Sequence, residues 1–319
     1  MKNPDTQTVH FEHLGQLKFL LPQLQDLKRQ QPAHYTKSIA SSLFIESWKR
    51  LFYGQHPEKI ALKITTKALL ALILPGCDAF FFKTAKIAPK SAENILKSAF
   101  FEHNKSALAT ELYQQLYAEI PALIAEFYDN DWDRKPSEFE EKYGFVNALC
   151  KQPRAGATKP GVPRLLLVPP EMHADHCLIT AVYAVLLSPG FEAKVGLPFL
   201  TGLAHHLHNA VLPDCGFAGE IALGNHLQPI IENSRIEALE GVDKNMKKRI
   251  VQAITNHENL NNAEGRSSSA ADVLDRVLDI KWRVRAASVT EKDVLDDLEL
   301  VHDGPIKSFQ TKVLRNAGL

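Results

Sequence analysis

Apolar residues recur at helical spacing along most of this chain, and short connections separate the stretches that carry the pattern. In the first half the pattern runs from Leu14 to about Arg29, from Ala33 to about Tyr53, from Pro57 to Leu74 and from Ser91 to about Tyr128. In the second half it covers about 172–188, 196–212, 217–236, 243–258 and 267–288. A period near 3.6 residues is typical of amphipathic helices, and helices joined by short loops predict an all-α protein.

A stretch rich in Pro, Gly and Lys interrupts the helical pattern at residues 151–163. This composition disfavours regular structure, so we expect a linker or a long loop there. We place a domain boundary in this stretch. It separates a helical N-terminal region, residues 1–150, from a C-terminal domain, residues 164–319. The short apolar run from Arg164 to Val168 fits a single strand or an extended entry to that domain.

The charge balance and the cysteines of the chain indicate which partners and which cell compartment to expect. The chain of 319 residues carries 37 acidic and 37 basic side chains, which gives no electrostatic reason to expect a nucleic acid or an anionic membrane as partner. The most apolar run, Ala68 to Pro75, is far shorter than the roughly 20 residues of a membrane span. Four cysteines without CxxC spacing indicate a reducing compartment, so we expect a soluble cytoplasmic protein.

Histidines gather in one part of the chain, and seven of the thirteen lie between residues 173 and 257. Neutral imidazole is the commonest protein ligand of transition metals, and carboxylates complete such sites. A single histidine beside an apolar stripe is more often a hydrogen-bonded core residue than a ligand. The spaced set predicts a metal site, whose candidates outside the densest segment are His173, His176, His226, His257 and Asp272.

The densest segment, residues 202–214, would form the centre of that site. A helix advances about 100° per residue, so it would place His205, His208 and Asn209 on one face. His206 would then point partly away from that face. One helix therefore supplies only part of the ligand set.

Asp272 follows three serines that can cap the start of a helix. An aspartate in the first turn lies at the positive end of the helix dipole, so we expect it to be ionised and able to bind a cation. Its neighbours Asp275 and Asp279 fit solvated positions on the same helix.

The order of these residues resembles the HD superfamily, the all-helical metal-dependent phosphohydrolases named for an adjacent His-Asp pair. The likeness covers about residues 165–290 and lies in three motifs. These are Ala174-Asp-His-Cys177 with His176 as ligand, Leu203-Ala-His-His-Leu-His-Asn-Ala210, and Ala270-Ala-Asp-Val-Leu-Asp-Arg276 with Asp272 as ligand. The resemblance implies an HD-type helical domain preceded by a helical N-terminal region.

The chain also departs from the family pattern. His206 stands where the family has the aspartate that bridges two metals, and Asn209 stands where nucleotidase-like members carry a glutamate. A carboxylate shares two oxygens between two ions, whereas a neutral imidazole offers one free lone pair, so the resemblance favours one ion. Members with two metals carry extra histidines between the second and third motifs, and His226 and His257 occupy such positions.

Two interpretations of the resemblance stay open. In the first, one divalent ion of zinc, iron, manganese or cobalt binds the protein, which hydrolyses a nucleotide or another small phosphate ester. The residues that this implies are His176, His205, His206 and Asp272 as metal ligands, Asp214 or His208 as general acid or base, and Arg266 and Asn209 as substrate-binding residues. In the second, catalysis is lost and the domain is a ligand-binding or regulatory module.

A smaller third possibility is oxidation, because some relatives hold two irons and activate dioxygen. Residues 1–150 fit a substrate lid, a dimerisation surface or a partner-binding region. A homo-oligomer is therefore one of the alternatives.

Overall fold

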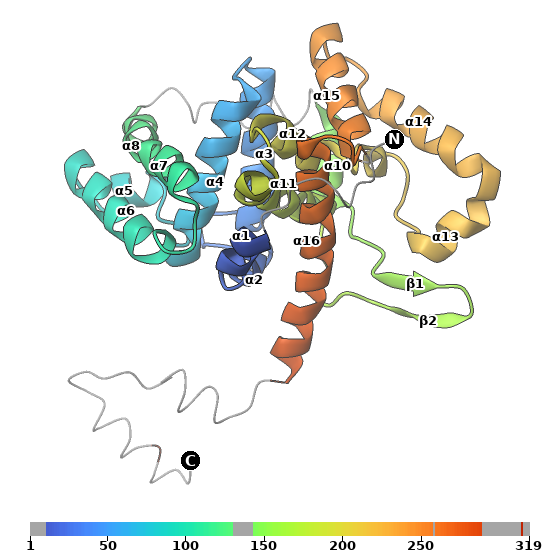
Figure 1. The fold of residues 1–319 in the computed structure, drawn as a ribbon, viewed down its shortest axis with the longest axis horizontal. Coiled ribbons are helices and arrows are strands. Elements are labelled where there is room, and N and C mark those ends of the chain that lie inside the picture. The colour runs from blue at the N-terminus through green and yellow to red at the C-terminus, as the bar shows by residue number, and fades with distance from the viewer. Residues whose placement is uncertain (1–10, 130–142, 258, 289–313, 315–319) are drawn as a thin grey trace. The chain divides into compact units, whose positions relative to one another are not determined.

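The computed structural model of the chain describes residues 11–129, 143–257, 259–288 and 314. Within these residues the protein is all-α apart from one two-stranded hairpin, which confirms the expected fold class (Figure 1). The hairpin pairs β1 (Ala157–Lys159) with β2 (Val162–Leu165) in antiparallel orientation. Gly161 in its turn has a φ of 75°, a conformation that glycine adopts without strain.

The helices follow the expected order along the chain. Those of the first half are α1 (Phe11–Leu17), α2 (Leu20–Leu24), η2 (Gln25–Lys28), α3 (Ile39–Phe52), α4 (Pro57–Ile73), α5 (Ala79–Thr84), α6 (Pro89–Asn104), α7 (Thr110–Ala118) and α8 (Ile120–Tyr128). The second half holds α10 (Gly144–Lys151), α11 (His173–Phe191), α12 (Gly196–Ala204), η3 (Leu207–Ala210), α13 (Gly216–Leu223), η4 (Gly224–His226), α14 (Leu227–Ala238), α15 (Lys244–His257) and α16 (Ala263–Ala287).

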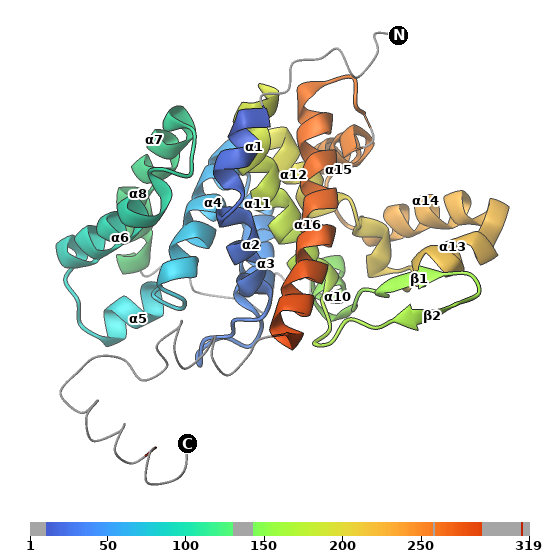
Figure 2. The same cartoon turned by 60° about the horizontal axis from the view of Figure 1, so that its bottom comes forward.

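Contacts between residues group the chain into two units, residues 1–278 and residues 279–319. In the first unit the central helix is α11, which packs against α1, α3, α4 and α12 (Figure 2). All of its residues except Pro189 are buried. The side chains that the later sections discuss belong to this first unit.

Helix α12 lies unusually close to α11 because Gly202 has no side chain. A Cβ atom at Gly202 would lie 2.5 Å from the backbone of Ala181, well inside van der Waals contact. Only glycine therefore allows this approach. The end of α12 is held against α11 as a result, and both helices carry histidines at that point.

The stretch 151–163 does not separate two packed cores. Residues on both sides of it, such as Trp48, Leu149 and Val182, belong to one hydrophobic cluster within the first unit. The stretch is also tied to the core, since the backbone N–H of Arg154 donates to the carbonyl of Glu171 at 2.8 Å. The expected linker is instead the end of α10 followed by the hairpin.

Among the described helices, α11 alone is long and apolar enough to cross a membrane. In this structure 94% of its most apolar window is buried inside the protein. Burial against α1, α3, α4 and α12 is the environment of a core helix.

Candidate metal centre

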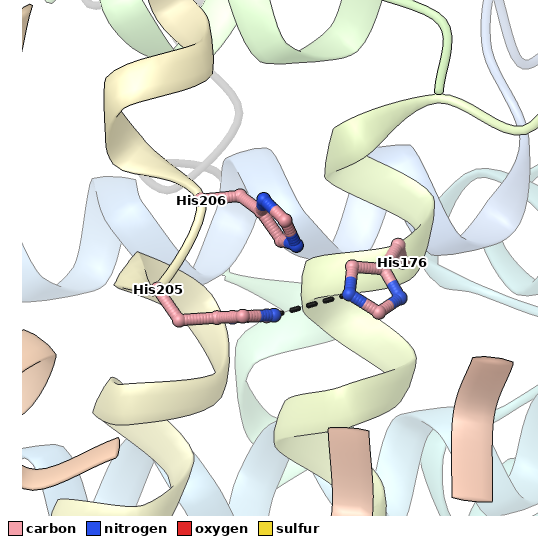
Figure 3. Close-up of side chains that lie close together, drawn as sticks. All are labelled: His176, His205 and His206. Atoms are coloured by element: carbon pink, nitrogen blue, oxygen red, sulfur yellow. Dashed lines mark hydrogen bonds between the residues drawn. The ribbon is translucent and has the colours of Figure 1, made fainter. Parts of the chain in front are cut away.

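Three elements bring histidines and aspartates together inside the first unit. Helix α11 carries His176, the segment after α12 carries His205 and His206, and α16 carries Asp272. Figure 3 shows His205 and His206 reaching from the end of α12 toward His176. One ring nitrogen of each of the three histidines lies within 4.8 Å of the others. The predicted ligands His176, His205 and His206 therefore do converge.

The orientation of His206 differs from the prediction for one continuous helix. Helix α12 ends at Ala204, and His206 has a φ of −99° and a ψ of 20°, outside the helical range. The 3-10 helix η3 begins at the next residue. This break in the helix turns His206 toward His176 beside His205, where an unbroken helix would have pointed it partly away.

Hydrogen bonds orient His176 and His205 by their Nδ1 atoms. Nδ1 of His176 lies 2.5 Å from Oδ2 of Asp275, and Nδ1 of His205 lies 2.8 Å from the carbonyl oxygen of Gly202. A carboxylate and a carbonyl only accept hydrogen bonds, so both imidazoles donate from Nδ1. The Nε2 lone pair of each ring is thus left for another partner, which is the arrangement found in metal-binding histidines.

His206 is oriented in the same way by an amide. The Nδ2 group of Asn209 donates to the carbonyl of Leu212 at 3.2 Å, which turns Oδ1 toward the ring of His206. Nδ1 of His206 lies 2.9 Å from this oxygen and donates to it. The Nε2 atom of His206 is again the one with a free lone pair. Asn209 therefore orients a predicted ligand.

The Nε2 atoms of His176 and His205 face each other at 3.0 Å. With both protons on Nδ1, two lone pairs meet there, and they repel each other unless a cation lies beside both. Two ligands at right angles around one ion, each about 2.1 Å from it, stand about 3.0 Å apart. The spacing of the two nitrogens therefore fits the coordination of a single metal ion.

Asp272 adds a carboxylate to the histidines. Its Oδ1 lies 3.3 Å from Nε2 of His176 and 3.9 Å from Nε2 of His205, and this buried oxygen makes no hydrogen bond within the described structure. Burial alone raises the pKa of Asp272, but the surrounding side chains, among them Arg276 at 3.5 Å, outweigh it and hold the pKa below its usual value. Asp272 is therefore ionised, but not for the expected reason. Helix α16 begins at Ala263, so the three serines and Asp272 lie inside the helix and not in its first turn.

His205 and His206 stay neutral. Burial, followed by the neighbouring imidazoles, holds the pKa of His205 and of His206 well below the usual value. A neutral imidazole is the form that binds a metal ion.

Asp275 and Asp279 are both buried, which corrects the expectation that they lie at solvated positions. Asp275 is the one that contacts His176. Both of its oxygens face the ammonium of Lys28, at 2.7 and 2.9 Å, and Oδ1 also accepts from Gln25 at 2.8 Å. Lys28 contacts Glu171 as well, at 2.5 Å. Glu171, His176 and Asp275 lie close enough to hold an ion, but the ammonium already occupies the space between the two carboxylates.

The two additional predicted ligands lie in different places. His226 is exposed at the end of η4 and is outside the ligand groups that the described residues form. His257 is closer, since its ring stacks on that of His205 with centroids 5.0 Å apart and its Nε2 lies 3.7 Å from Oδ2 of Asp272. The prediction of His226 as a ligand is therefore not supported by its position, whereas His257 borders the site.

Asp214 lies beside His173 at the edge of the cluster. Its oxygens accept from the backbone N–H groups of Ala155 and Gly216, both at 2.9 Å, and Oδ2 lies 3.4 Å from Nε2 of His173. Burial raises the pKa of Asp214, but His173 and the two N–H groups lower it far below its usual value. Such a carboxylate is a weak base, because it takes up a proton only in strong acid. The ring of His173 in turn lies 4.9 Å from that of His206.

His208 reaches the other side of His206, with ring centroids 5.8 Å apart. Burial, followed by the charge of Arg235, lowers the pKa of His208 to about 4. The imidazole is therefore neutral near pH 7, and its buried Nδ1 makes no hydrogen bond within the described structure.

Arg266 points elsewhere, and its guanidinium donates to the carbonyl of Leu260 at 3.3 Å. The arginine that faces the cluster is Arg154, which sequence reasoning missed. Its guanidinium lies 3.7 Å from Glu171, and its charge acts on His173 and His206. Arg154 precedes the hairpin, in the stretch that the sequence pattern assigned to a linker, so no helical spacing connected it to the site.

Carboxylates outnumber cations around the histidines. Lys28, Arg154 and the half-exposed Arg276 are the cations that contact carboxylates there, and the carboxylates are Glu171, Asp214, Asp272 and Asp275. A metal ion beside Asp272 would add positive charge where carboxylates are in excess.

The residues therefore fit a divalent cation in donor type and in spacing. Comparisons of the chain with protein-family models, with curated proteins and with solved structures find no match.

Proposed function

We propose that this protein is a metal-dependent phosphohydrolase that acts on a nucleotide or another small phosphate ester. Its ion would be held by His176, His205, His206 and Asp272. The observation that carries the proposal is that all three histidines donate from Nδ1, and that the Nε2 atoms of His176 and His205 face each other beside the buried oxygen of Asp272. The reaction class comes from the resemblance to the HD superfamily.

Three imidazoles and one carboxylate suit zinc, iron, manganese or cobalt better than magnesium or calcium, which prefer oxygen ligands. When bound, such an ion lowers the pKa of a coordinated water and polarises a phosphoryl oxygen. Four protein ligands leave positions open for both in an octahedral ion.

Arg154 replaces Arg266 as the residue that we assign to phosphate binding. Its guanidinium makes a single ion pair among the described residues, at 3.7 Å, so most of its five N–H donors are available to phosphate oxygens. His208 is the better of the two candidates for proton transfer, because its Nδ1 has no hydrogen bond while Asp214 is held by two backbone groups. We assign Asp214 to the positioning of His173.

We also propose a cytoplasmic location. The proposal rests on the sequence, whose four cysteines lack CxxC spacing and are too few for a disulfide framework.

Metal analysis of the purified protein tests the proposal, together with the variants His205→Ala and Asp272→Ala. We expect about one ion per chain that both variants lose. His226→Ala is the matched control, since it removes a histidine of the same region that is exposed and away from the cluster, and it should keep its metal. Metal content unchanged in both ligand variants would contradict the proposed site.

A panel of phosphomonoesters and phosphodiesters with added manganese then tests the reaction. Turnover that disappears in Asp272→Ala supports the hydrolase. A bound ion without turnover would favour the alternative of a ligand-binding or regulatory module.

A further inference from the structure

The N-terminal segment 20–28 reaches the metal centre through one buried carboxylate. Lys28 and Gln25 both lie in η2, and their side chains contact Asp275 of α16. The exposed fractions of the Lys28 and Asp275 side chains are 1% and 0%, so neither contact competes with water. Leu24 and Leu27 beside them are fully buried in the hydrophobic core, which fixes the position of the segment.

The contacts leave Asp275 one orientation. Its Oδ1 accepts from Gln25 at 2.8 Å and lies 2.7 Å from Lys28, while Oδ2 lies 2.9 Å from Lys28 and accepts from His176 at 2.5 Å. Turning the carboxylate would break at least one of these contacts. The ring of His176 is thus aimed by a side chain that residues of the N-terminal segment hold in place.

Outer partners of this kind control metal affinity, because they fix both the direction and the tautomer of a ligating imidazole. Here the partner, Asp275, is itself held by a segment more than 140 residues away in sequence from His176. A purely structural ion pair would stabilise the fold without acting on the ion. A substitution in a structural ion pair lowers only the stability, whereas a substitution in a positioning residue also lowers the metal affinity.

We propose that Lys28 is a positioning residue of the metal centre, and that docking of the segment 20–28 and metal binding favour each other. The inference rests on the proposed metal site, whose ligands it does not change. Because a coupling between two binding events is reciprocal, a bound ion should also hold the segment more firmly.

The test measures the affinity of folded protein for zinc or cobalt by competition with a chelator. Lys28→Met removes the ammonium but keeps most of the side-chain volume, and we expect it to weaken the affinity by about 10-fold to 100-fold. Arg50→Met is the matched control, since Arg50 is an equally buried cation in a network away from the site. It should lower the stability and leave the affinity within about twofold of the wild type.

A double variant shows whether Lys28 acts through Asp275. If it does, Lys28→Met combined with Asp275→Asn binds the ion no more weakly than Asp275→Asn alone, because coupled residues are not additive. Additive losses would contradict the proposed route.

Gln25→Met serves if Lys28→Met does not fold, because it removes one hydrogen bond and no charge. It should weaken binding in the same direction by a smaller factor. An unchanged affinity in Gln25→Met, or a loss in Arg50→Met equal to that in Lys28→Met, would overturn the inference.

Hydrogen exchange gives a second readout. Added zinc should slow exchange of the amides in residues 20–28 of the wild type more than those of α7, which lies outside the network. The difference should vanish in Lys28→Met. A wild type that binds no metal at all would instead refute the proposed function.

Discussion

Two buried charge networks in this protein differ in whether they are complete. Around Arg50, the carboxylates of Glu46 and Glu126 each contact the guanidinium at 2.7 Å, and Lys67 and Lys63 contact the same two carboxylates. Each of these carboxylates has two cationic partners. Around Asp272, by contrast, negative charge is in excess and a buried carboxylate oxygen makes no hydrogen bond within the described structure.

The comparison teaches that burial of charge does not by itself mark a functional site. A complete network stabilises the fold, because removal of one member takes away a contact from each of its buried partners. An incomplete one indicates a partner that the polypeptide does not supply. The incomplete network here also lies next to two Nε2 atoms, of His176 and His205, that face each other at 3.0 Å.

The largest expected effect is on the complete network. Arg50→Met leaves Glu46 and Glu126 without their shared partner and should lower the free energy of unfolding by about 3 to 5 kcal/mol. Urea unfolding measures the change. A loss below about 1 kcal/mol would show that this network is not a source of stability.

The pH dependence of the same network sharpens the comparison. Burial raises the pKa of Glu46, but Lys67 and Arg50 outweigh it and lower the pKa to about 2 from the usual 4.5. A depressed folded pKa contributes stability that is present above 4.5 and lost as the pH falls toward 2, in total about 3 kcal/mol. The difference in unfolding free energy between the wild type and Glu46→Gln should therefore shrink over that pH range. A difference that is constant from pH 6 to pH 2 would contradict this origin.

A bound metal ion should supply the missing partner of the network around Asp272 and stabilise the protein. An ion at 100 times its dissociation constant should raise the free energy of unfolding by about 2.7 kcal/mol, since it binds the folded state. A chelator should reverse the gain, and Asp272→Ala should not show it. Equal stabilisation of the variant by zinc would place the ion elsewhere. Thermal or urea unfolding with and without zinc measures this.

The smallest effect concerns the amide that orients His206. Asn209→Ala removes the acceptor for Nδ1 and should weaken metal binding by about 10-fold, or about 1.4 kcal/mol. Asn209→Asp keeps an acceptor and should retain most of the affinity in the same chelator competition. If both variants behave alike, the hydrogen bond to His206 has no part in binding.

Much of the fold was predictable because helical periodicity is local information. Pro57 begins α4 as expected, and α11 and α15 lie close to the predicted ranges. The hairpin was missed, since three-residue and four-residue strands carry too few apolar positions to form a pattern. The sequence did not predict that helices on both sides of residues 151–163 share one core. The apolar pattern of a helix shows which face is buried but not which distant helix covers it.

The site was predictable where ligands follow motif spacing and not where they depend on tertiary contacts. His176, His205, His206 and Asp272 converge as expected, although the break after Ala204 was needed to turn His206 inward. Asp275 had a usable signal, because it lies one helical turn from Asp272 and shares its face. Lys28 and Arg154 had none, since their partners are far away in sequence.

The missing side chain of Gly202 has a consequence for the chemistry as well as for the packing. It lets α12 close on α11, and its own carbonyl orients the ring of His205. The distance between the Nε2 atoms of His176 and His205 therefore depends on the absence of a side chain at Gly202, although Gly202 itself would not contact an ion. Gly202→Ala should push α12 away from α11 and increase this distance without changing any ligand. The wider site should favour a larger cation over a smaller one.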